Sequence, residues 1–308
     1  MKKIFMMITS MLCFALLLSG CTTKQTKQDD SLAIVATTTM LADLTKIIGG
    51  EHVSVEGLMG PGIDPHLYQA SAGDVTRMQN ADIVVYNGLH LEGKMSELFE
   101  KLTDSGRTVI SIEKGLNSSM LLNAADAPNV HDPHIWFDVA LWKQAAKAVA
   151  DGLKSADSEH ASSYEDNLKN YLEELDQLDA YIRNRIAELP KEQRVLITAH
   201  DAFSYFGHAY EFEVKGLQGI STEAEAGTYD VSNLAQFIVE RKIKAIFVES
   251  SVPTKTIEAL QAAVKAKGFD VSIGGELYSD SIGGIGTNED TYIAAFQANV
   301  DTIVDALK

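Results

Sequence analysis

Cysteine is scarce in this chain, and so is positive charge. The cysteines are Cys13 and Cys21, and we expect Cys13 to leave with an N-terminal targeting segment. The single cysteine that remains forms no disulfide within the chain. The 26 lysines and arginines stand against 43 aspartates and glutamates, which gives a formal charge of −17 over 308 residues. A nucleic-acid partner is thereby excluded, because such a surface repels the phosphate backbone.

Long hydrophobic runs are also missing, apart from one near the N-terminus. Lys2 and Lys3 precede an apolar stretch over residues 4–18, which is short beside the roughly 20 residues that a membrane-spanning helix needs. The sequence LSGC at residues 18–21 instead resembles a lipobox, the signal that is cleaved before a lipid-carrying cysteine. We therefore expect a signal peptide over residues 1–20, a lipid anchor at Cys21 and a flexible tether over residues 21–31.

Glycine and proline are absent from residues 158–189, so this stretch contains no helix breaker. Its apolar residues recur at steps of three and four, which places them on one face of an α-helix. They are Ala161, Tyr164, Leu168, Tyr171, Leu175, Leu178, Ile182, Ile186 and Leu189. Asp157 or Ser158 is expected to cap the helix, and Pro190 to end it. Its length of about 45 Å suits either a long helix within one domain or a rigid connection between two lobes.

Strand-like and helix-like segments alternate on both sides of this helix, which favours the connection between two lobes. Short apolar runs predict strands over residues 32–37, 52–59, 82–86, 108–112, 194–198, 213–217, 245–248 and 270–273. Helical spacing predicts helices over residues 40–48, 136–153, 201–210, 231–242, 255–267 and 291–307, and a short helix that begins at about residue 72. We expect Gly274, Gly275, Gly283 and Gly284 to be turn residues.

Strands and helices in this order are typical of parallel β-sheets, and 308 residues are enough for two lobes with cores of their own. We therefore predict an α/β fold of two lobes, each with a parallel β-sheet flanked by helices, joined by one long rigid α-helix. The expected limits are residues 32–157 for the N-terminal lobe, 158–190 for the connecting helix and 191–308 for the C-terminal lobe. A single helix between lobes permits little hinge motion.

Four side chains with good donor atoms lie just beyond predicted strands or at the start of a predicted helix. His66 follows the second strand, His134 opens the last helix of the N-terminal lobe, His200 follows the first strand of the C-terminal lobe, and Asp280 follows the last strand. Ligands of open α/β sheets bind beyond the carboxyl ends of the strands. We therefore expect the four side chains to meet between the lobes, two from each.

Three imidazoles and one carboxylate form a good ligand set for a divalent transition metal. Each of His66 and His134 follows an Asp-Pro pair, in which the proline stiffens the turn that presents the imidazole. An imidazole must be neutral to bind a metal, so we expect affinity to fall as the pH drops through about 6.5.

Other side chains near these positions have roles that the pattern leaves open. Asp64 or Asp132 is a candidate to orient the imidazole that follows it. Glu249 and Glu276 lie near strand ends and are candidates for a supporting or a replacement carboxylate. His131 is a possible additional ligand, three residues before His134. The other histidines have no ligand argument; they are His52, His90, His160 and His208.

Several long motifs resemble one known family, the metal-binding lipoproteins of manganese and zinc ABC importers (the TroA-like, cluster A-I group). The motifs are GPGIDPHLY at residues 60–68, DPHIW at 132–136, TAHDAF at 198–203, ESS at 249–251 and LYSD at 277–280. The similarity spans essentially the whole chain after the tether. It implies two α/β lobes, a rigid connecting helix and one metal bound between the lobes.

Carried over position by position, the ligands of the family fall on His66, His134, His200 and Asp280. The resemblance also implies an ABC permease and its ATPase as partners. It implies a lipid-anchored protein at the extracytoplasmic face of the cell membrane, which we expect to be a monomer. Some manganese-binding members carry glutamate at the third ligand position, where this chain has His200.

The observations that bear on the identity of the metal oppose one another. Three nitrogen donors favour Zn²⁺ over Mn²⁺. Zinc-specific members often carry a histidine-rich loop, however, and residues 117–130 contain no histidine. Because the motifs around His66 and His200 also resemble the manganese branch, we expect Mn²⁺ to be the preferred cargo, with Zn²⁺ or iron as the alternative.

Two other functional classes have less support. A surface metallohydrolase needs an open coordination position on the metal, and the chain lacks an HExxH motif, a nucleophile elbow and a phosphate-binding glycine loop. No motif favours an adhesin. We therefore expect no enzymatic activity.

Overall fold

The computed structural model describes residues 31–124 and 129–308. The predicted signal peptide, Cys21 and all but the last residue of the predicted tether lie outside these residues. Ser31–Lys308 form one compact unit. Within the described residues, no helix combines the length and the apolar character that crossing a bilayer requires.

The N-terminal lobe is built on a four-stranded parallel sheet with the order β2-β1-β3-β4. Its strands are β1 (Leu32–Ala36), β2 (Val53–Gly57), β3 (Ile83–Tyr86) and β4 (Thr108–Ser111). Its helices are α2 (Thr39–Gly49), α3 (Ala72–Asn80), α4 (Ser96–Asp104) and α5 (Val139–Ala156).

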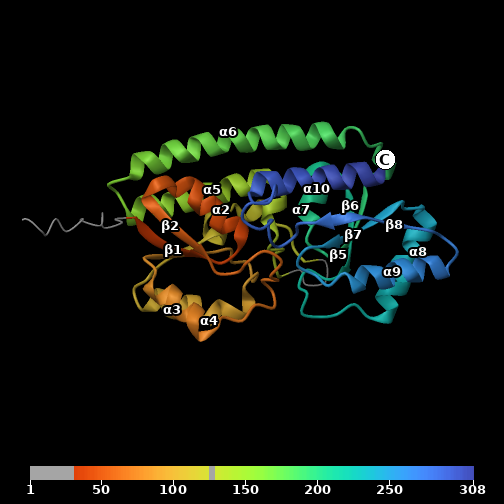
Figure 1. Ribbon diagram of the computed structural model, residues 1–308, viewed down its shortest axis with the longest axis horizontal. Helices are drawn as coiled ribbons and strands as arrows, with labels where there is room; N and C mark the ends of the chain where they lie inside the picture. The colour runs from red at the N-terminus through yellow and green to blue at the C-terminus, as the bar shows by residue number, and fades with distance from the viewer. Residues whose placement is uncertain (1–30, 125–128) are drawn as a thin grey trace, which may run out of the picture. The chain divides into compact units, whose positions relative to one another are not determined.

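Both faces of this sheet are covered, as the uninterrupted apolar character of its strands requires. Side chains of a strand alternate between faces. Ile34 and Ile83 therefore pack with the side of the sheet covered by α2 and α5, whereas Val35 and Val84 pack with α3 and α4. Figure 1 shows these two pairs of helices on opposite sides of β1 and β2.

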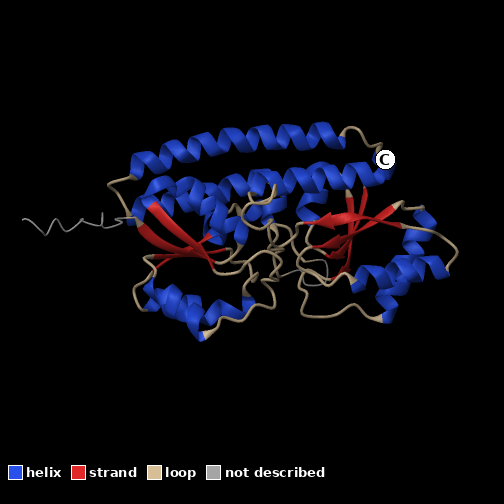
Figure 2. Cartoon of the chain, in the orientation of Figure 1, coloured by secondary structure: helices blue, strands red, loops and turns tan. Residues whose placement is uncertain are grey.

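The C-terminal lobe contains two parallel strand pairs, β5–β6 and β7–β8, with β5 next to β7. The strands are β5 (Val195–His200), β6 (Glu213–Gln218), β7 (Ala245–Glu249) and β8 (Ser272–Leu277). The helices are α7 (Ser204–Tyr210), α8 (Thr228–Arg241), α9 (Lys255–Ala266) and α10 (Tyr292–Leu307). Figure 2 shows the strands of this lobe flanked by helices, as in the first.

Helix α6 (Ala161–Ile186) joins the two lobes and packs against α2, α5 and α10. Its buried residues form the predicted stripe: Tyr164, Leu168, Tyr171, Leu175, Leu178, Ile182 and Ile186. The predicted fold is confirmed, with a helix that contacts both lobes along its length. The helix is shorter at both ends than expected: its N-cap is His160 and not Asp157 or Ser158, and it ends at Ile186, before Pro190. The side chain of Asp157 still accepts hydrogen bonds from the His160 backbone and the Tyr164 hydroxyl.

Short 3₁₀ turns connect several of these elements. They are Gly50–His52, Gly93–Met95, Ile112–Gly115, Ser118–Met120, Ile135–Phe137 and Lys191–Gln193. His134 was expected to open a helix, but it precedes the turn Ile135–Phe137, and α5 begins at Val139. Asp138 caps α5 by accepting the backbone N–H of Ala140 at 2.8 Å. His134 is therefore presented by a tight turn, whose direction is set separately from that of α5.

Two local predictions were incomplete or wrong. Helix α4 was not predicted, because its nine residues bury only Phe99 and Leu102, which is too short a pattern to read as a helix. Gly274 and Gly275 are not turn residues but lie within β8. A Cβ atom on Gly274 would lie 2.7 Å from Ala306 and Phe247, so glycine is needed there for α10 to approach the sheet.

Candidate metal centre

The four side chains predicted from strand ends lie together in the structure. His66 comes from the loop after β2, His134 from the turn before α5, His200 from the last position of β5, and Asp280 from the segment after β8. Their candidate donor atoms all lie within 4.8 Å of one another. The exposed fractions are 4% for His66, 0% for His134 and His200, and 1% for Asp280. The cluster is thus fully enclosed by the protein.

The distances within the cluster match the size of a metal coordination shell. The Nε2 atom of His134 lies 3.2 Å from Nε2 of His66 and 3.4 Å from Nε2 of His200. Asp280 Oδ1 lies 3.5 Å from Nε2 of both His134 and His200. Ligands about 2.1 Å from a tetrahedral ion are separated by about 3.4 Å. The cluster therefore has the dimensions of a four-ligand site.

Asp132 orients the imidazole of His134. Its Oδ1 atom lies 2.7 Å from Nδ1 of His134 and also accepts the backbone N–H of that residue at 2.9 Å. An ionised carboxylate only accepts, so Nδ1 carries a proton and Nε2, which faces the cluster, is the nitrogen that can bind a metal. The orienting role considered for Asp132 is confirmed.

Glu249 does the same for His200 from the neighbouring strand β7. Its Oε2 atom lies 2.6 Å from Nδ1 of His200, and its Oε1 accepts the backbone N–H of His200 at 2.9 Å. Glu249 is buried, whereas the other candidate, Glu276, is exposed on β8. Glu249 is therefore the supporting carboxylate, and Glu276 is not part of the centre.

Asp64 does not orient the imidazole of His66. Its Oδ1 atom accepts the backbone N–H of His66 at 2.8 Å, and its other oxygen accepts the hydroxyl of Thr222 from the C-terminal lobe. Asp64 thus fixes the turn before His66 and links it to the other lobe. His131, considered as an additional ligand, does not belong to the group of converging donors.

Asp280 has one oxygen that no described group satisfies. Its Oδ2 accepts the hydroxyl of Ser251 at 2.7 Å. Its Oδ1 is buried and accepts no hydrogen bond within the described part of the chain. A buried carboxylate oxygen without a partner is unfavourable, and Oδ1 is the oxygen that faces the imidazoles. Oδ1 is therefore free to bind a positively charged partner such as a metal ion.

Burial and charged neighbours shift the pKa values of all four side chains. Burial lowers the pKa of His66 to about 3. Burial also acts against a charge on His134, but Asp132 and Asp280 outweigh it and raise the pKa of His134 to about 9. The pKa of His200 is raised well above its usual value, because Glu249 and Asp280 overcome the effect of burial. The same histidines overcome the effect of burial on Asp280 and hold its pKa well below its usual range.

A second buried carboxylate, Glu92, supports the turn that carries His134. Glu92 accepts the Thr37 hydroxyl at 2.6 Å and the backbone N–H of Asn87 at 2.9 Å. The Asn87 side chain in turn donates to the carbonyl of Pro133 at 3.1 Å. Neither Glu92 nor Asn87 was predicted from the sequence, although Asn87 directly follows the apolar run at residues 82–86, where polar side chains of functional sites are expected.

Trp136 links the segments that carry His134 and Asp280. Its indole N–H donates to the carbonyl of Ser279 at 2.8 Å, and its ring lies edge-on to the imidazole of His134 at 5.3 Å. The two ligands are thereby held across the boundary between the lobes.

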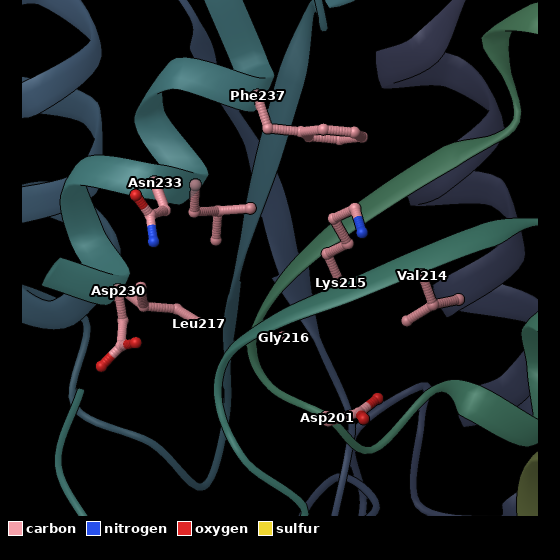
Figure 3. Close-up of a pocket in the computed structure, with 9 residues that line it drawn as sticks. Asp201, Val214, Lys215, Gly216, Leu217, Asp230, Asn233 and Phe237 are labelled. Atoms are coloured by element: carbon pink, nitrogen blue, oxygen red, sulfur yellow. The ribbon is translucent and has the colours of Figure 1, made fainter. Parts of the chain in front are cut away.

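A pocket of about 420 Å³ lies in the C-terminal lobe (Figure 3). Its lining includes Asp201, Lys215, Asp230 and Phe237, and none of the four donors. Gly216 lines this pocket and packs against the backbone of His200, since a Cβ atom there would lie 2.5 Å from the carbonyl carbon of His200. The enclosed donor cluster therefore suits a single ion and not a larger molecule.

Replacing Glu249 with glutamine tests the support of His200. Loss of this carboxylate is expected to weaken metal binding by about 10- to 100-fold, because His200 loses its charged partner while the ligands remain. Calorimetric titration with Zn²⁺ and Mn²⁺ measures the effect. Glu276→Gln, an exposed change on β8, is the matched control. Equal affinity of Glu249→Gln and the control would contradict this role.

An enclosed centre of three histidines and one aspartate, between two α/β lobes joined by one helix, defines a metal-binding protein of the two-lobed solute-binding class. The family model of the zinc-uptake complex component A, periplasmic (ZnuA), matches residues 34–306. The chain belongs to this family.

Three relatives are similar over nearly the whole chain. The zinc-binding protein TroA of Treponema pallidum is 49% identical over 284 residues, which are 92% of this chain and 91% of TroA. Its solved structure has a TM-score of 0.87 and covers 90% of this chain and 99% of its own. The manganese-binding lipoprotein MntA of Bacillus subtilis is 45% identical over 293 residues (94% and 95%). The manganese ABC transporter substrate-binding lipoprotein PsaA of Streptococcus pneumoniae is 28% identical over 314 residues (100% and 99%).

Proposed function

We propose that this protein captures one divalent transition-metal ion with His66, His134, His200 and Asp280 and delivers it to an ABC permease driven by its ATPase. The observation that carries the proposal is the convergence of four buried donors from both lobes around an unsatisfied Asp280 oxygen. Relatives named as ABC transporter substrate-binding lipoproteins support the partners.

The ion is cargo and not a catalyst in this proposal. Four protein ligands complete the coordination of a tetrahedral ion, whereas a catalytic metal keeps a position open for water or substrate. The donors are also enclosed, so a substrate to be hydrolysed has no access to the ion. We therefore assign no enzymatic activity to the chain.

We propose manganese as the cargo and zinc as the second candidate. The motifs around His66 and His200 and the lack of histidine in residues 117–130 support manganese. Three nitrogen donors at tetrahedral spacing support zinc, and relatives of both kinds are similar to the chain. Zn²⁺ is expected to bind more tightly than Mn²⁺ whichever ion is the cargo. Tighter binding does not by itself decide the cargo, because delivery also requires release of the ion.

We further propose that the protein is a monomer held by lipid at Cys21 on the extracytoplasmic face of the cell membrane. The lipobox at residues 18–21 and relatives named as lipoproteins support the anchor. The proposed parts are a signal peptide (1–20), a tether (21–31), two lobes (32–157 and 191–308) and the connecting helix (158–190).

Release of the ion requires contacts between the lobes to give way, because the donors are enclosed. Besides the Asp64–Thr222 hydrogen bond, Lys94 pairs with Glu223 at 2.5 Å. The backbone N–H of Gly62 also donates to the hydroxyl of Ser281 at 2.9 Å. Two of these contacts involve residues close in sequence to His66 and Asp280, and all three are bonds between the lobes that an opening movement would break.

Metal analysis of the purified protein tests the proposed function. We expect one equivalent of bound metal after purification without added metal, and displacement of Mn²⁺ by Zn²⁺ in competition. The same preparation is expected to leave a model ester intact. A protein that binds neither metal would refute the proposal, and ester turnover that disappears in His200→Ala would favour an enzyme instead.

A further inference from the structure

The segment that follows Asp280 is fixed to helix α2 of the N-terminal lobe at two points. The backbone N–H of Ile282 donates to the hydroxyl oxygen of Thr39 at 2.9 Å. The backbone N–H of Tyr292 donates to Oδ2 of Asp43, also at 2.9 Å. Thr39 and Asp43 are four residues apart on α2 and therefore lie on the same face of that helix. One face of one helix thus holds the chain on both sides of residues 283–291.

Between these two points the chain forms a loop that is closed by its own hydrogen bonds. The backbone N–H of Gly283 donates to the carbonyl of Glu289 at 2.7 Å. The backbone N–H of Gly286 donates to the carboxylate of Asp290 at 2.9 Å. The loop is expected to move as a unit, because bending it would break these internal bonds. Moving it away from the N-terminal lobe therefore requires the bonds to α2 to break.

The second point of attachment lies at the start of α10, beside α2 (Figure 1). Tyr292 is buried, its ring stacks on Trp142 at 4.7 Å, and its hydroxyl donates to the carbonyl of Trp136 at 2.6 Å. Burial raises the pKa of Asp43 to about 6, so the carboxylate is ionised at neutral pH. An anion at the N-terminus of a helix is stabilised by the free N–H groups there.

We propose that Thr39 and Asp43 are positioning residues, which hold the Asp280 segment against the N-terminal lobe and thereby slow the release of the metal. Asp280 lies two residues before the first point of attachment, so a segment freed from α2 carries this ligand away from the two histidines of the N-terminal lobe. Neither Thr39 nor Asp43 belongs to the group of converging donors. They therefore act on the opening of the site and not on the coordination of the ion. The inference rests on the proposed function and names what restrains release.

Removing each attachment tests this role. Protein loaded with Mn²⁺ or Zn²⁺ is mixed with a chelator, whose concentration is raised until the rate of metal loss no longer depends on it. The rate is expected to rise by about tenfold in Asp43→Ala, the size of one hydrogen bond to a charged group, and by about fivefold in Thr39→Val, which loses a neutral one. Asp43→Asn keeps an acceptor oxygen and is expected to release metal more slowly than Asp43→Ala.

Two controls separate a role in release from a general loss of structure. Thr45→Val removes a buried hydroxyl from the same helix, one that has no partner among the described residues, and is expected to keep the wild-type release rate. The visible spectrum of bound Co²⁺ reports the ligands around the ion. It is expected to be the same in all variants, because the ligands are unchanged.

The outcomes distinguish the role of α2 from the proposed function. A release rate in either variant, Thr39→Val or Asp43→Ala, that equals the rate of Thr45→Val would overturn the role of that residue. A Co²⁺ spectrum that differs from the wild type would also overturn it, since the coordination itself would then have changed. Thr39→Val, which nearly preserves the side-chain shape, carries the test if Asp43→Ala does not fold. A wild-type protein that binds neither Mn²⁺ nor Zn²⁺ would instead overturn the proposed function.

Discussion

His134→Ala is expected to lose most of its metal affinity, by more than about a hundredfold, while the chain still folds. His134 is the central side chain of the donor cluster, since its Nε2 atom lies within 3.5 Å of a donor atom from each of His66, His200 and Asp280. Removing a ligand is expected to cost more than the 10- to 100-fold that loss of a supporting partner costs. Calorimetric titration of the variant and the wild type with Zn²⁺ and Mn²⁺ measures the loss.

Thermal unfolding separates loss of binding from loss of the fold. Metal that binds only the folded protein raises the unfolding temperature, so saturating Zn²⁺ is expected to stabilise the wild type and to have little effect on His134→Ala. His131→Ala is the control, because His131 lies three residues away and outside the donor group. Unaltered metal stoichiometry and affinity in His134→Ala would refute the assignment of the site.

Metal affinity is expected to rise with pH through neutrality and up to about pH 9. The pKa of His134 is about 9 and that of His200 is raised well above its usual value, so in the metal-free protein these imidazoles carry protons at pH 7. A metal ion must displace these protons, and each one displaced changes the affinity by about tenfold per pH unit. His66, with a pKa of about 3, is already neutral and does not contribute.

This range lies above the value near 6.5 that unperturbed imidazoles would give. The difference arises because Asp132, Glu249 and Asp280 stabilise the protonated rings by more than burial opposes them. Titrations in buffers of different ionisation enthalpy count the protons released at each pH. Asp132→Asn removes the negative charge beside His134, which lowers the pKa of that imidazole. The pH at which metal affinity reaches its plateau is therefore expected to fall. A plateau already reached at pH 7, without proton release, would contradict the prediction.

The connecting helix shows what local sequence pattern can determine. Its stripe from Tyr164 to Ile186 was predicted because helical spacing depends only on neighbours along the chain, and the same residues are buried in the structure. The four donors were predicted for a related reason: the carboxyl ends of parallel strands meet at one edge of a sheet. Periodicity and strand order thus predicted that His200 and Asp280 lie near each other, although they did not give the distance between the two side chains.

The supporting residues required the tertiary structure. Glu249 and Glu276 both lie near strand ends, and only the placement of β7 beside β5 brings Glu249 to His200 and leaves Glu276 exposed. The sequence likewise did not reveal that Gly274 lies in β8. Glycine is needed there because a Cβ atom would collide with Ala306 on α10, which is far away in the sequence.

The sequence by itself determined the α/β pattern, the connecting helix and the four candidate ligands, because each is encoded by spacing or by position at a strand end. The tertiary structure decided which carboxylate orients each histidine and which oxygen of Asp280 is free. Those outcomes depend on contacts of a few ångströms between segments far apart in the chain, such as Ser251 with Asp280, and no local pattern specifies them.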